Sequence, residues 1–158
     1  MICLSLFNTL ALSLLILLTS SCMHTPTKQV TGYTSAIGDK AARMAISMIG
    51  RPYMYQGDSP AGFDCSGLVR YCYLTAGLDV PHGTKDLQNV TRPVSTHNMQ
   101  KGDLLFFDVK GEKYSHVGIY IGNNCFVHAP STGKTVRRNC LRETYWKKHF
   151  LEARRFNE

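Results

Sequence analysis

The sequence predicts a single α+β domain, in which amphipathic helices come first and a mainly antiparallel sheet follows. The chain has 158 residues, of which 44% are apolar, so one compact core is expected and a second folded domain is not. Apolar residues recur at helical spacing before about residue 90, whereas short apolar runs bounded by turn residues follow it. Helices followed by strands are typical of α+β architecture.

The chain begins with an uncharged apolar segment. Residues 1–22 contain no Lys, Arg, Asp or Glu, and residues 10–18 are almost wholly apolar, which is the length of a signal-peptide core rather than of a membrane span. We therefore expect residues 1–21 to be a signal peptide and the mature protein to be exported. The segment Leu18-Thr19-Ser20-Ser21-Cys22 resembles the lipobox of bacterial lipoproteins, in which Cys22 would carry the lipid. The alternative is an ordinary cleaved signal with an incidental cysteine.

A tether and a basic domain are expected after Cys22. Residues 22–38, rich in Thr and containing Pro and Gly, are interpreted as a lipidated tether that leads to a domain over 39–158. Met23 resembles the following residue of lipoproteins sorted to the outer membrane, so we expect a periplasmic, lipid-anchored protein. The formal net charge of +7 lies wholly outside the signal. It favours a polyanionic neighbour such as cell wall or anionic lipid, and not nucleic acid, although solubilising surface charge explains it equally well.

Two helices are predicted in the first half of the domain. The apolar positions over 39–49 recur at helical spacing, and Gly50 ends this first amphipathic helix. A second helix is predicted over 65–76, because Asp64 is a favourable N-cap residue and Gly77 is a favourable C-terminal cap.

Strands are predicted in the second half. Short runs rich in β-branched and aromatic residues, which are preferred in strands, follow a short helical piece near 84–90. These predicted strands cover 104–107, 116–121, 125–129 and 135–138.

The segment Gly122-Asn123-Asn124 between two of these strands is a hairpin signal. Its length decides whether two histidines meet. A loop of three residues would place Gly118 opposite His128, so that His116 and His128 share a face of the sheet as diagonal neighbours. A loop of two residues would put the two histidines on opposite faces.

Cys65 directly precedes the second helical pattern, in Phe63-Asp64-Cys65-Ser66-Gly67. A helix N-terminus and a nearby imidazole both lower the pKa of a thiol, so Cys65 is the candidate nucleophile. We expect the helix to pack on the His116 face of the sheet. His116 would then take the thiol proton and return it to a leaving amine, while His128 fixes the tautomer of His116. The Cys65 N–H and the Tyr53 hydroxyl are candidate donors to an oxyanion.

Each of these residues also has a structural explanation. A lone cysteine is commonly a small buried hydrophobe, and a lone histidine is commonly a core or surface residue. Cys65, His116 and His128 are also ligand types that zinc accepts, with water in the fourth position. Their spacing resembles no local ligand pair, so neither a metal nor another cofactor is expected.

The remaining cysteines and histidines have less context. Cys72, Cys125 and Cys140 form an odd set, so buried free thiols are favoured, and a Cys125–Cys140 bridge is the alternative that an exported protein permits. Four histidines are assigned to surface or loop positions: His24, His82, His97 and His149.

Five motifs in this order resemble the NlpC/P60 family of cell-wall cysteine peptidases. They are Gly50-Arg51-Pro52-Tyr53, Gly62-Phe63-Asp64-Cys65-Ser66-Gly67, Lys101-Gly102-Asp103-Leu104, His116-Val117-Gly118-Ile119-Tyr120-Ile121-Gly122 and Phe126-Val127-His128-Ala129. The resemblance covers about residue 39 to the end and implies a papain-like core. It is strongest toward lipoprotein murein endopeptidases of the Spr or MepS type, including the endings Tyr145-Trp146-Lys147-Lys148 and Glu152-Ala153-Arg154-Arg155.

This resemblance implies a peptidoglycan endopeptidase that cuts stem peptides or the cross-link between D-alanine and diaminopimelate. It implies Cys65 as nucleophile, His116 as base and His128 as the third polar residue. Oxyanion stabilisation or substrate binding is expected from three further residues, which are Tyr53, Asp64 and Ser66. Gln56 interrupts the usual Gly-Gly, and His82 stands where Arg is frequent. The resemblance therefore does not decide which bond of the stem peptides is cleaved.

Two other functions stay open. One is a cysteine amidase or acyltransferase that acts on a substrate other than murein, and the other is a non-catalytic lipoprotein that binds the cell wall. We expect a monomer that contacts peptidoglycan and reaches the membrane through Cys22. The sequence leaves a regulatory adaptor open.

Overall fold

The computed structural model describes residues 29–109, 111–132 and 134–158. The expected signal peptide, Cys22 and the first part of the expected tether lie outside the described residues. Within these ranges, no helix is both long enough and apolar enough to cross a membrane.

Helix α1 (Ser35–Ser47) begins before the expected start at residue 39. Thr34 is its N-cap, and the Thr34 hydroxyl accepts a hydrogen bond from the Ile37 N–H at 3.3 Å. Val30 and Tyr33 are buried in the core that α1 covers. The residues just before the expected domain boundary therefore pack on the domain, because a capping threonine and a buried aromatic residue extend the fold beyond the apolar periodicity.

Helix α2 (Cys65–Ala76) confirms the predicted boundaries and both caps. The Asp64 carboxylate accepts a hydrogen bond from the Gly67 N–H at 2.7 Å, and Gly77 ends the helix with a φ of 103°. A positive φ of this size favours glycine, which has no Cβ. A short helix α3 (Thr84–Asn89) follows, close to the predicted helical piece.

The main sheet has six strands, and every neighbouring pair is antiparallel. In order across the sheet they are β3 (Thr91–Val94), β8 (Phe150–Phe156), β4 (Leu104–Phe107), β5 (His116–Gly122), β6 (Cys125–His128) and β7 (Arg137–Cys140). The smaller elements are β1 (Asp58–Ser59), β2 (Gly62–Phe63), the 3₁₀ helix η1 (Thr96–Asn98) and α4 (Thr144–His149). The α+β prediction is confirmed.

Sequence patterns missed β3, β8 and α4 and placed β7 too early. β3 contains Pro93 and lies at the sheet edge, where a missing N–H is tolerated. In β8 the consecutive Arg154 and Arg155 obscure the alternation of a strand, although β8 lies between β3 and β4. Its place in the sheet is set by pairing with both neighbours rather than by its own pattern.

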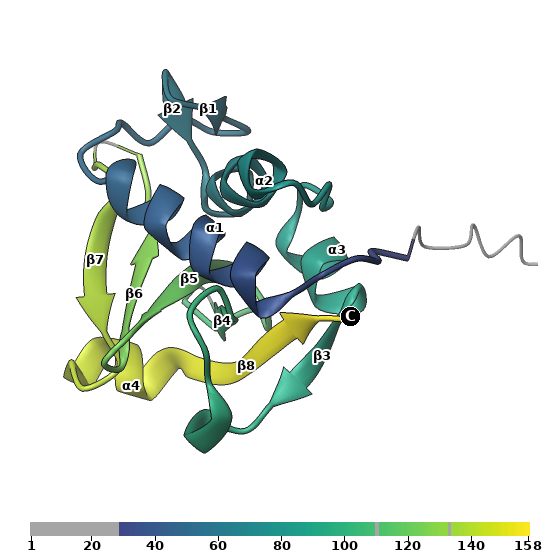
Figure 1. Cartoon of the computed structure of the whole chain (residues 1–158). Coiled ribbons are helices and arrows are strands. Elements are labelled where there is room, and N and C mark those ends of the chain that lie inside the picture. The colour runs from purple at the N-terminus through teal and green to yellow at the C-terminus, as the bar shows by residue number, and fades with distance from the viewer. Residues whose placement is uncertain (1–28, 110, 133) are drawn as a thin grey trace, which may run out of the picture.

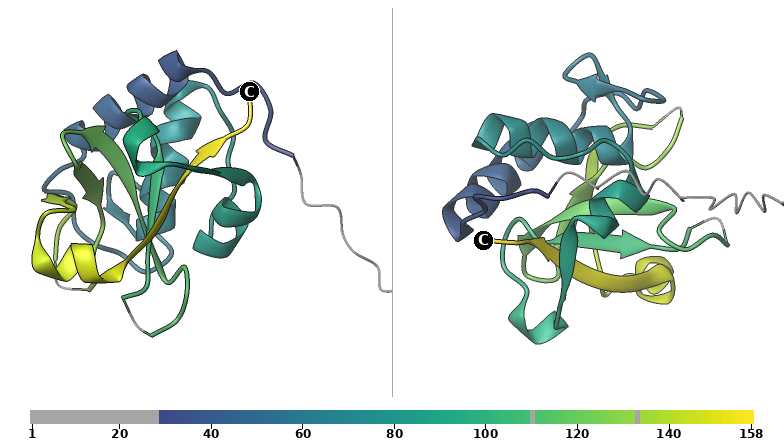
Figure 2. Two further views of the ribbon diagram at one scale, coloured as in Figure 1. Left: turned by 90° about the horizontal axis from the view of Figure 1, so that it is seen from below. Right: turned by 90° about the vertical axis from the view of Figure 1, so that its right-hand side faces the viewer.

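The two faces of the sheet carry different helices (Figures 1 and 2). Helices α1 and α2 cover the face that bears Val117, Ile119 and Val127. The other face bears Phe107 and Phe126, which pack with Trp146 of α4. The sheet, with the start of β5 and the end of β6, lies between the α1–α2 layer and α4.

The β5–β6 hairpin reaches the expected register in an unexpected way. Asn123 and Asn124 form the loop, and both have φ near 55°, as a tight hairpin turn requires. Ile119 pairs with Val127, but Gly122 pairs with Cys125, so a register shift takes up one residue. The loop therefore has two residues, which is the length that was expected to put the two histidines on opposite faces. The bulge nevertheless preserves the register that places both histidines on one face.

Cys125 and Cys140 form a disulfide between directly opposite residues of β6 and β7. The expectation of free thiols is wrong for these two cysteines. Cys140 lay outside the predicted strand over 135–138, so the sequence did not reveal that the two residues face each other. Cys72 is a buried free thiol, as expected.

Candidate active site

The candidate nucleophile, Cys65, is the first residue of α2 and is half-buried. The backbone N–H groups of Val117, of Ser66 and of Cys65 itself lie near enough to the sulfur to lower its pKa. Val117 is the second residue of β5. The thiol therefore lies where the N-terminus of α2 meets the start of β5.

The surroundings of Cys65 favour its neutral thiol form. Burial, together with the negative charge of Asp64, raises the pKa of Cys65 to about 11, and the backbone N–H donors lower it by less. This shift is opposite in direction to the lowering that the helix N-terminus led us to expect. Because the sulfur is buried and an N-cap carboxylate lies beside it, a base must remove the proton during attack.

Two buried imidazoles meet where β5 begins and β6 ends. His116 begins β5 and His128 ends β6, and their exposed fractions are 3% and 0%. His116 Nε2 lies 2.8 Å from His128 Nδ1. Burial, with a smaller effect of the charges on Arg137 and Lys134, lowers the pKa of His128 to about 4. His128 is therefore a neutral partner near neutral pH.

The hydrogen-bonded chain continues to the protein surface. His128 Nε2 lies 2.9 Å from Asn139 Oδ1, and Asn139 Nδ2 donates to Glu143 Oε2 at 2.7 Å. The other Glu143 oxygen accepts the Cys140 N–H. Asn139 is diagonal to His128 across β6 and β7, and Glu143 is the N-cap residue of α4.

The polarity of this chain assigns both tautomers. An ionised Glu143 only accepts hydrogen bonds, so Asn139 turns its amide nitrogen toward Glu143 and its oxygen toward His128. His128 must then carry its proton on Nε2, which leaves Nδ1 to accept from His116 Nε2. The lone pair of neutral His116 is therefore on Nδ1. Glu143 thus determines, through three hydrogen bonds, which nitrogen can act as a base.

His116 does not lie on the face of the sheet that α2 covers. Its ring packs with Phe107 and Trp146, at centroid distances of 6.1 and 5.8 Å, on the α4 side. The expectation that α2 packs on the His116 face is wrong, because alternation along β5 turns Val117 toward α2. The thiol instead reaches the backbone at the start of β5.

Asp64 holds the loop that precedes the nucleophile. Besides capping α2, its carboxylate accepts from the Ser66 hydroxyl at 3.0 Å and lies 3.1 and 3.2 Å from His82 Nε2. His82 lies in the loop between α2 and α3, as expected, but its contact with Asp64 was not expected. The contact was not predicted because the two residues lie far apart in the sequence. The presence of His where the family frequently has a basic residue was a signal that could have indicated it.

Tyr53 is the candidate hydroxyl donor. Burial, and then the nearby Cys65 and Asp64, raise the pKa of Tyr53, so the hydroxyl keeps its proton. Tyr53 and Cys65 both pack against the main hydrophobic core. A protonated phenol can donate to a negatively charged oxygen.

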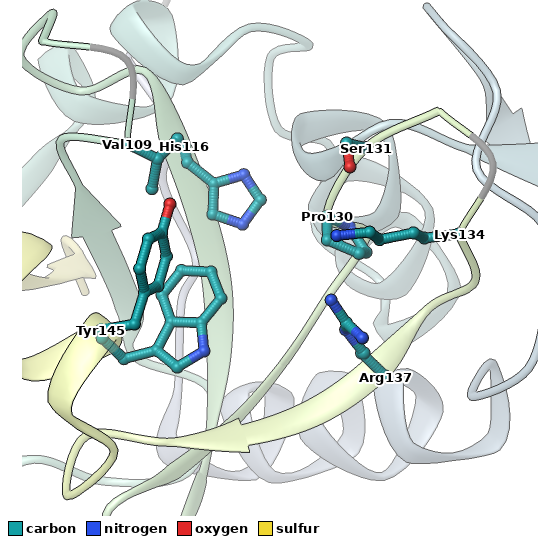
Figure 3. A pocket seen from close by; sticks show the side chains of 8 residues that line it. Val109, His116, Pro130, Ser131, Lys134, Arg137 and Tyr145 are labelled. Atoms are coloured by element: carbon teal, nitrogen blue, oxygen red, sulfur yellow. The ribbon is translucent and has the colours of Figure 1, made fainter.

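Two cavities flank the candidate site. The cavity of about 660 Å³ on one side, here called the Cys65 cavity, is lined by residues that include Tyr55, Gln56, Asp64, Cys65, Ser66 and His82. The cavity of about 290 Å³ on the other side, here called the His116 cavity, is lined by residues that include His116, Pro130, Lys134, Arg137, Tyr145 and Trp146 (Figure 3). Neither group of lining residues contains both Cys65 and His116, so the candidate nucleophile and base open onto different cavities.

Metal ligation was an alternative for the same residues. In the described part of the chain, no group of three or more His, Cys, Asp or Glu side chains is arranged to hold a metal ion.

Comparisons with known proteins identify the family of this chain. The model of the NlpC/P60 family matches residues 50–155. The murein DD-endopeptidase MepH of Escherichia coli K12 is 37% identical over 73% of this chain and 46% of its own length. The murein DD-endopeptidase MepS/murein LD-carboxypeptidase of the same strain is 44% identical over 65% of this chain and 54% of its own. This chain thus spans about half the length of these curated relatives.

A solved structure gives the same result for the fold. The NlpC/P60 domain of the peptidoglycan hydrolase SagA matches with a TM-score of 0.64 and 32% identity, over 77% of this chain and 98% of that domain. A family match over more than half of the residues and a shared fold establish the relationship. The chain belongs to the NlpC/P60 family.

Proposed function

We propose that this protein is a peptidoglycan endopeptidase that hydrolyses an amide bond by a Cys65-His116-His128 mechanism. The observation that carries the proposal is the placement of the Cys65 thiol at the start of β5, where His116 begins a hydrogen-bonded chain of fixed polarity. The relatives named murein DD-endopeptidases favour the cross-link between D-alanine and diaminopimelate as the bond.

The first step is attack by the Cys65 sulfur on the amide carbonyl. Since the resting thiol is neutral, His116 Nδ1 takes its proton as the sulfur–carbon bond forms. His116 then becomes an imidazolium whose Nε2 proton is held by His128 Nδ1. The role of His128 is thus to orient His116 and to stabilise its positive charge.

The second step releases the amine. The carbon–nitrogen bond breaks as His116 returns its proton to the nitrogen, which leaves a thioester on Cys65. A water molecule then attacks the thioester, with His116 again accepting a proton, and the free carboxylate and thiol are restored. The Cys65 N–H and the Tyr53 hydroxyl are proposed to stabilise the oxyanion in both steps, supported by the raised pKa of Tyr53.

Asp64 and Ser66 are proposed to act through the shape of the loop that presents Cys65. Asp64 fixes the first turn of α2 through its hydrogen bonds with Gly67 and Ser66. Both residues also line the Cys65 cavity, where the acyl part of the substrate would lie.

The cell envelope is the proposed location. Lipid attachment at Cys22 after removal of residues 1–21, with anchoring in the outer membrane, is proposed from the lipobox-like segment. A basic monomeric domain on a tether would then face the anionic cell wall.

Mass spectrometry of muropeptides tests the reaction. Purified protein is incubated with cross-linked dimers and with uncross-linked stems, and products are identified by mass. Conversion of dimers to monomers is expected. Shortened stems with intact cross-links would show instead that a different stem bond is cut, and no product from either substrate would favour a wall-binding role.

A further inference from the structure

We propose that the His116 cavity is a carboxylate-binding subsite for the amine side of the scissile bond, with Lys134 and Arg137 as its cationic ligands. This inference rests on the proposed endopeptidase function. It goes beyond that function by naming the chemical group of the leaving amine that the enzyme recognises.

The positions of the two cavities determine which part of a substrate each one takes. The acyl part stays bonded to Cys65, so it must occupy the Cys65 cavity. The leaving amine receives its proton from His116, so the residue that bears this amine must lie against His116. The His116 cavity includes His116 among its lining residues, and it is therefore the place for the amine side.

The His116 cavity is strongly electropositive. The side chains of Lys134 and Arg137 point into it from the side opposite His116 (Figure 3). None of its lining residues is acidic, and neither cation has an acidic partner among the residues that the structure describes. Four other cations among the described residues are paired with acidic side chains: Arg70 with Asp58, Lys85 with Glu112, Arg154 with Glu152 and Arg155 with Asp103.

The fold holds the two cations at the histidine pair. Arg137 is directly opposite His128 in the β6–β7 register, so both side chains leave the same face. Lys134 is placed by the segment that pairs with Tyr53, where the Tyr53 N–H donates to the Lys134 carbonyl at 2.9 Å. Both positive charges also disfavour protonation of the buried His128.

These charges oppose the imidazolium that the reaction requires. A bound anion would offset their effect on the histidine pair just when His116 accepts the thiol proton. An anionic leaving group would therefore assist catalysis as well as binding. The nearby aromatic side chains of Tyr145 and Trp146 offer an apolar wall to the rest of that residue.

The chemistry of the cross-link supplies such an anion. Diaminopimelate has two amino-acid centres, and an amide on the amine of the second centre leaves a carboxylate on the adjacent carbon. This carboxylate is two bonds from the scissile nitrogen. An arginine binds a carboxylate with two parallel hydrogen bonds, and a lysine adds a point charge.

The test compares two cross-linked dimers that differ only at this carboxylate, which is free in one and amidated in the other. Wild-type protein, Lys134→Gln, Arg137→Gln and Arg138→Gln are assayed for kcat/KM on both dimers. Arg138 is the matched control because it is an exposed cation on the same strand but lies opposite Val127, on the other face.

Wild type and Arg138→Gln are expected to prefer the free carboxylate by about tenfold or more, as for a charge-assisted hydrogen bond. Arg137→Gln and Lys134→Gln are expected to reduce this preference several-fold, mainly through slower cleavage of the free-carboxylate dimer. Equal cleavage of both dimers by wild type would overturn the subsite. So would variants that lose activity equally on both dimers. Absence of Cys65-dependent cleavage of either dimer by wild type would instead contradict the proposed function itself.

Discussion

Asn139 Oδ1 lies 2.9 Å from Nε2 of the buried His128, although Asn139 belongs to an edge strand and is itself bonded to the exposed Glu143. This contact connects a surface carboxylate with the candidate base. Because the Asn139 amide has a donor end and an acceptor end, it determines which atom donates in each hydrogen bond of the chain and not only where the side chains lie. The orientation of His116 depends on it.

Asn139→Asp is expected to lower kcat about tenfold, because a second carboxylate faces Glu143 and disturbs the hydrogen bond to His128. Adding Glu143→Gln to this variant restores a donor opposite the new acceptor. The double variant should therefore recover most of the lost kcat with little change in KM. A steady-state comparison of the two variants with wild type measures this, and an equally inactive double variant would mean that the chain has no directional role.

Acid is expected to destabilise the protein through His128. Its pKa is about 4 in the folded protein and 6.5 ordinarily, so the unfolded chain binds a proton first as pH falls. Stability is therefore lost between about pH 6.5 and 4, by roughly 3 kcal/mol in total. Urea unfolding at several pH values measures this slope. His128→Gln should flatten it, and an unchanged slope in that variant would assign the effect to other groups.

The Cys125–Cys140 bridge is expected to stabilise the strand pair that carries His128 and Asn139. The bridge joins residues 15 apart in sequence, so its loss should lower the free energy of unfolding by about 3 kcal/mol. Denaturant unfolding of a variant with Ser at both positions, beside Cys72→Ala, tests this. Equal stability with and without the bridge would contradict it.

Membrane attachment is expected to depend on Cys22, which lies outside the described residues. Cys22→Ser should move the protein from the membrane fraction to the soluble fraction without loss of activity, because the proposed Cys65 chemistry does not involve the lipid. Fractionation of cells that express each form provides the measurement. Unaltered membrane association would rule out lipid attachment at Cys22.

Local sequence patterns predicted what depends on local interactions. Asp64 and Gly77 define α2 because capping involves only neighbouring residues. The meeting of His116 and His128 was predictable in outline because one hairpin sets it. The bulge that keeps both histidines on one face despite a loop of two residues was not predictable, since it depends on pairing across the sheet.

Other features of the site depend on long-range packing. The contact of His82 with Asp64 joins residues 18 apart, and the role of Asn139 requires the correct position of β7. The thiol pKa was predicted in the wrong direction because a helix N-terminus is visible in the sequence and burial is not. The prediction that α2 covers the sheet face bearing His116 failed for a related reason. Alternation along a strand shows which residues share a face, but not which helix covers that face.

The role of the Cys65 thiol as nucleophile is tested by the rate of dimer cleavage by Cys65→Ala, measured beside Cys72→Ala. Both substitutions remove one free thiol from the same helix, but Cys65 lines a cavity whereas Cys72 is fully buried. The mechanism predicts no turnover by Cys65→Ala at an unchanged melting temperature, with activity retained in Cys72→Ala. Cleavage by Cys65→Ala at the wild-type rate would contradict it.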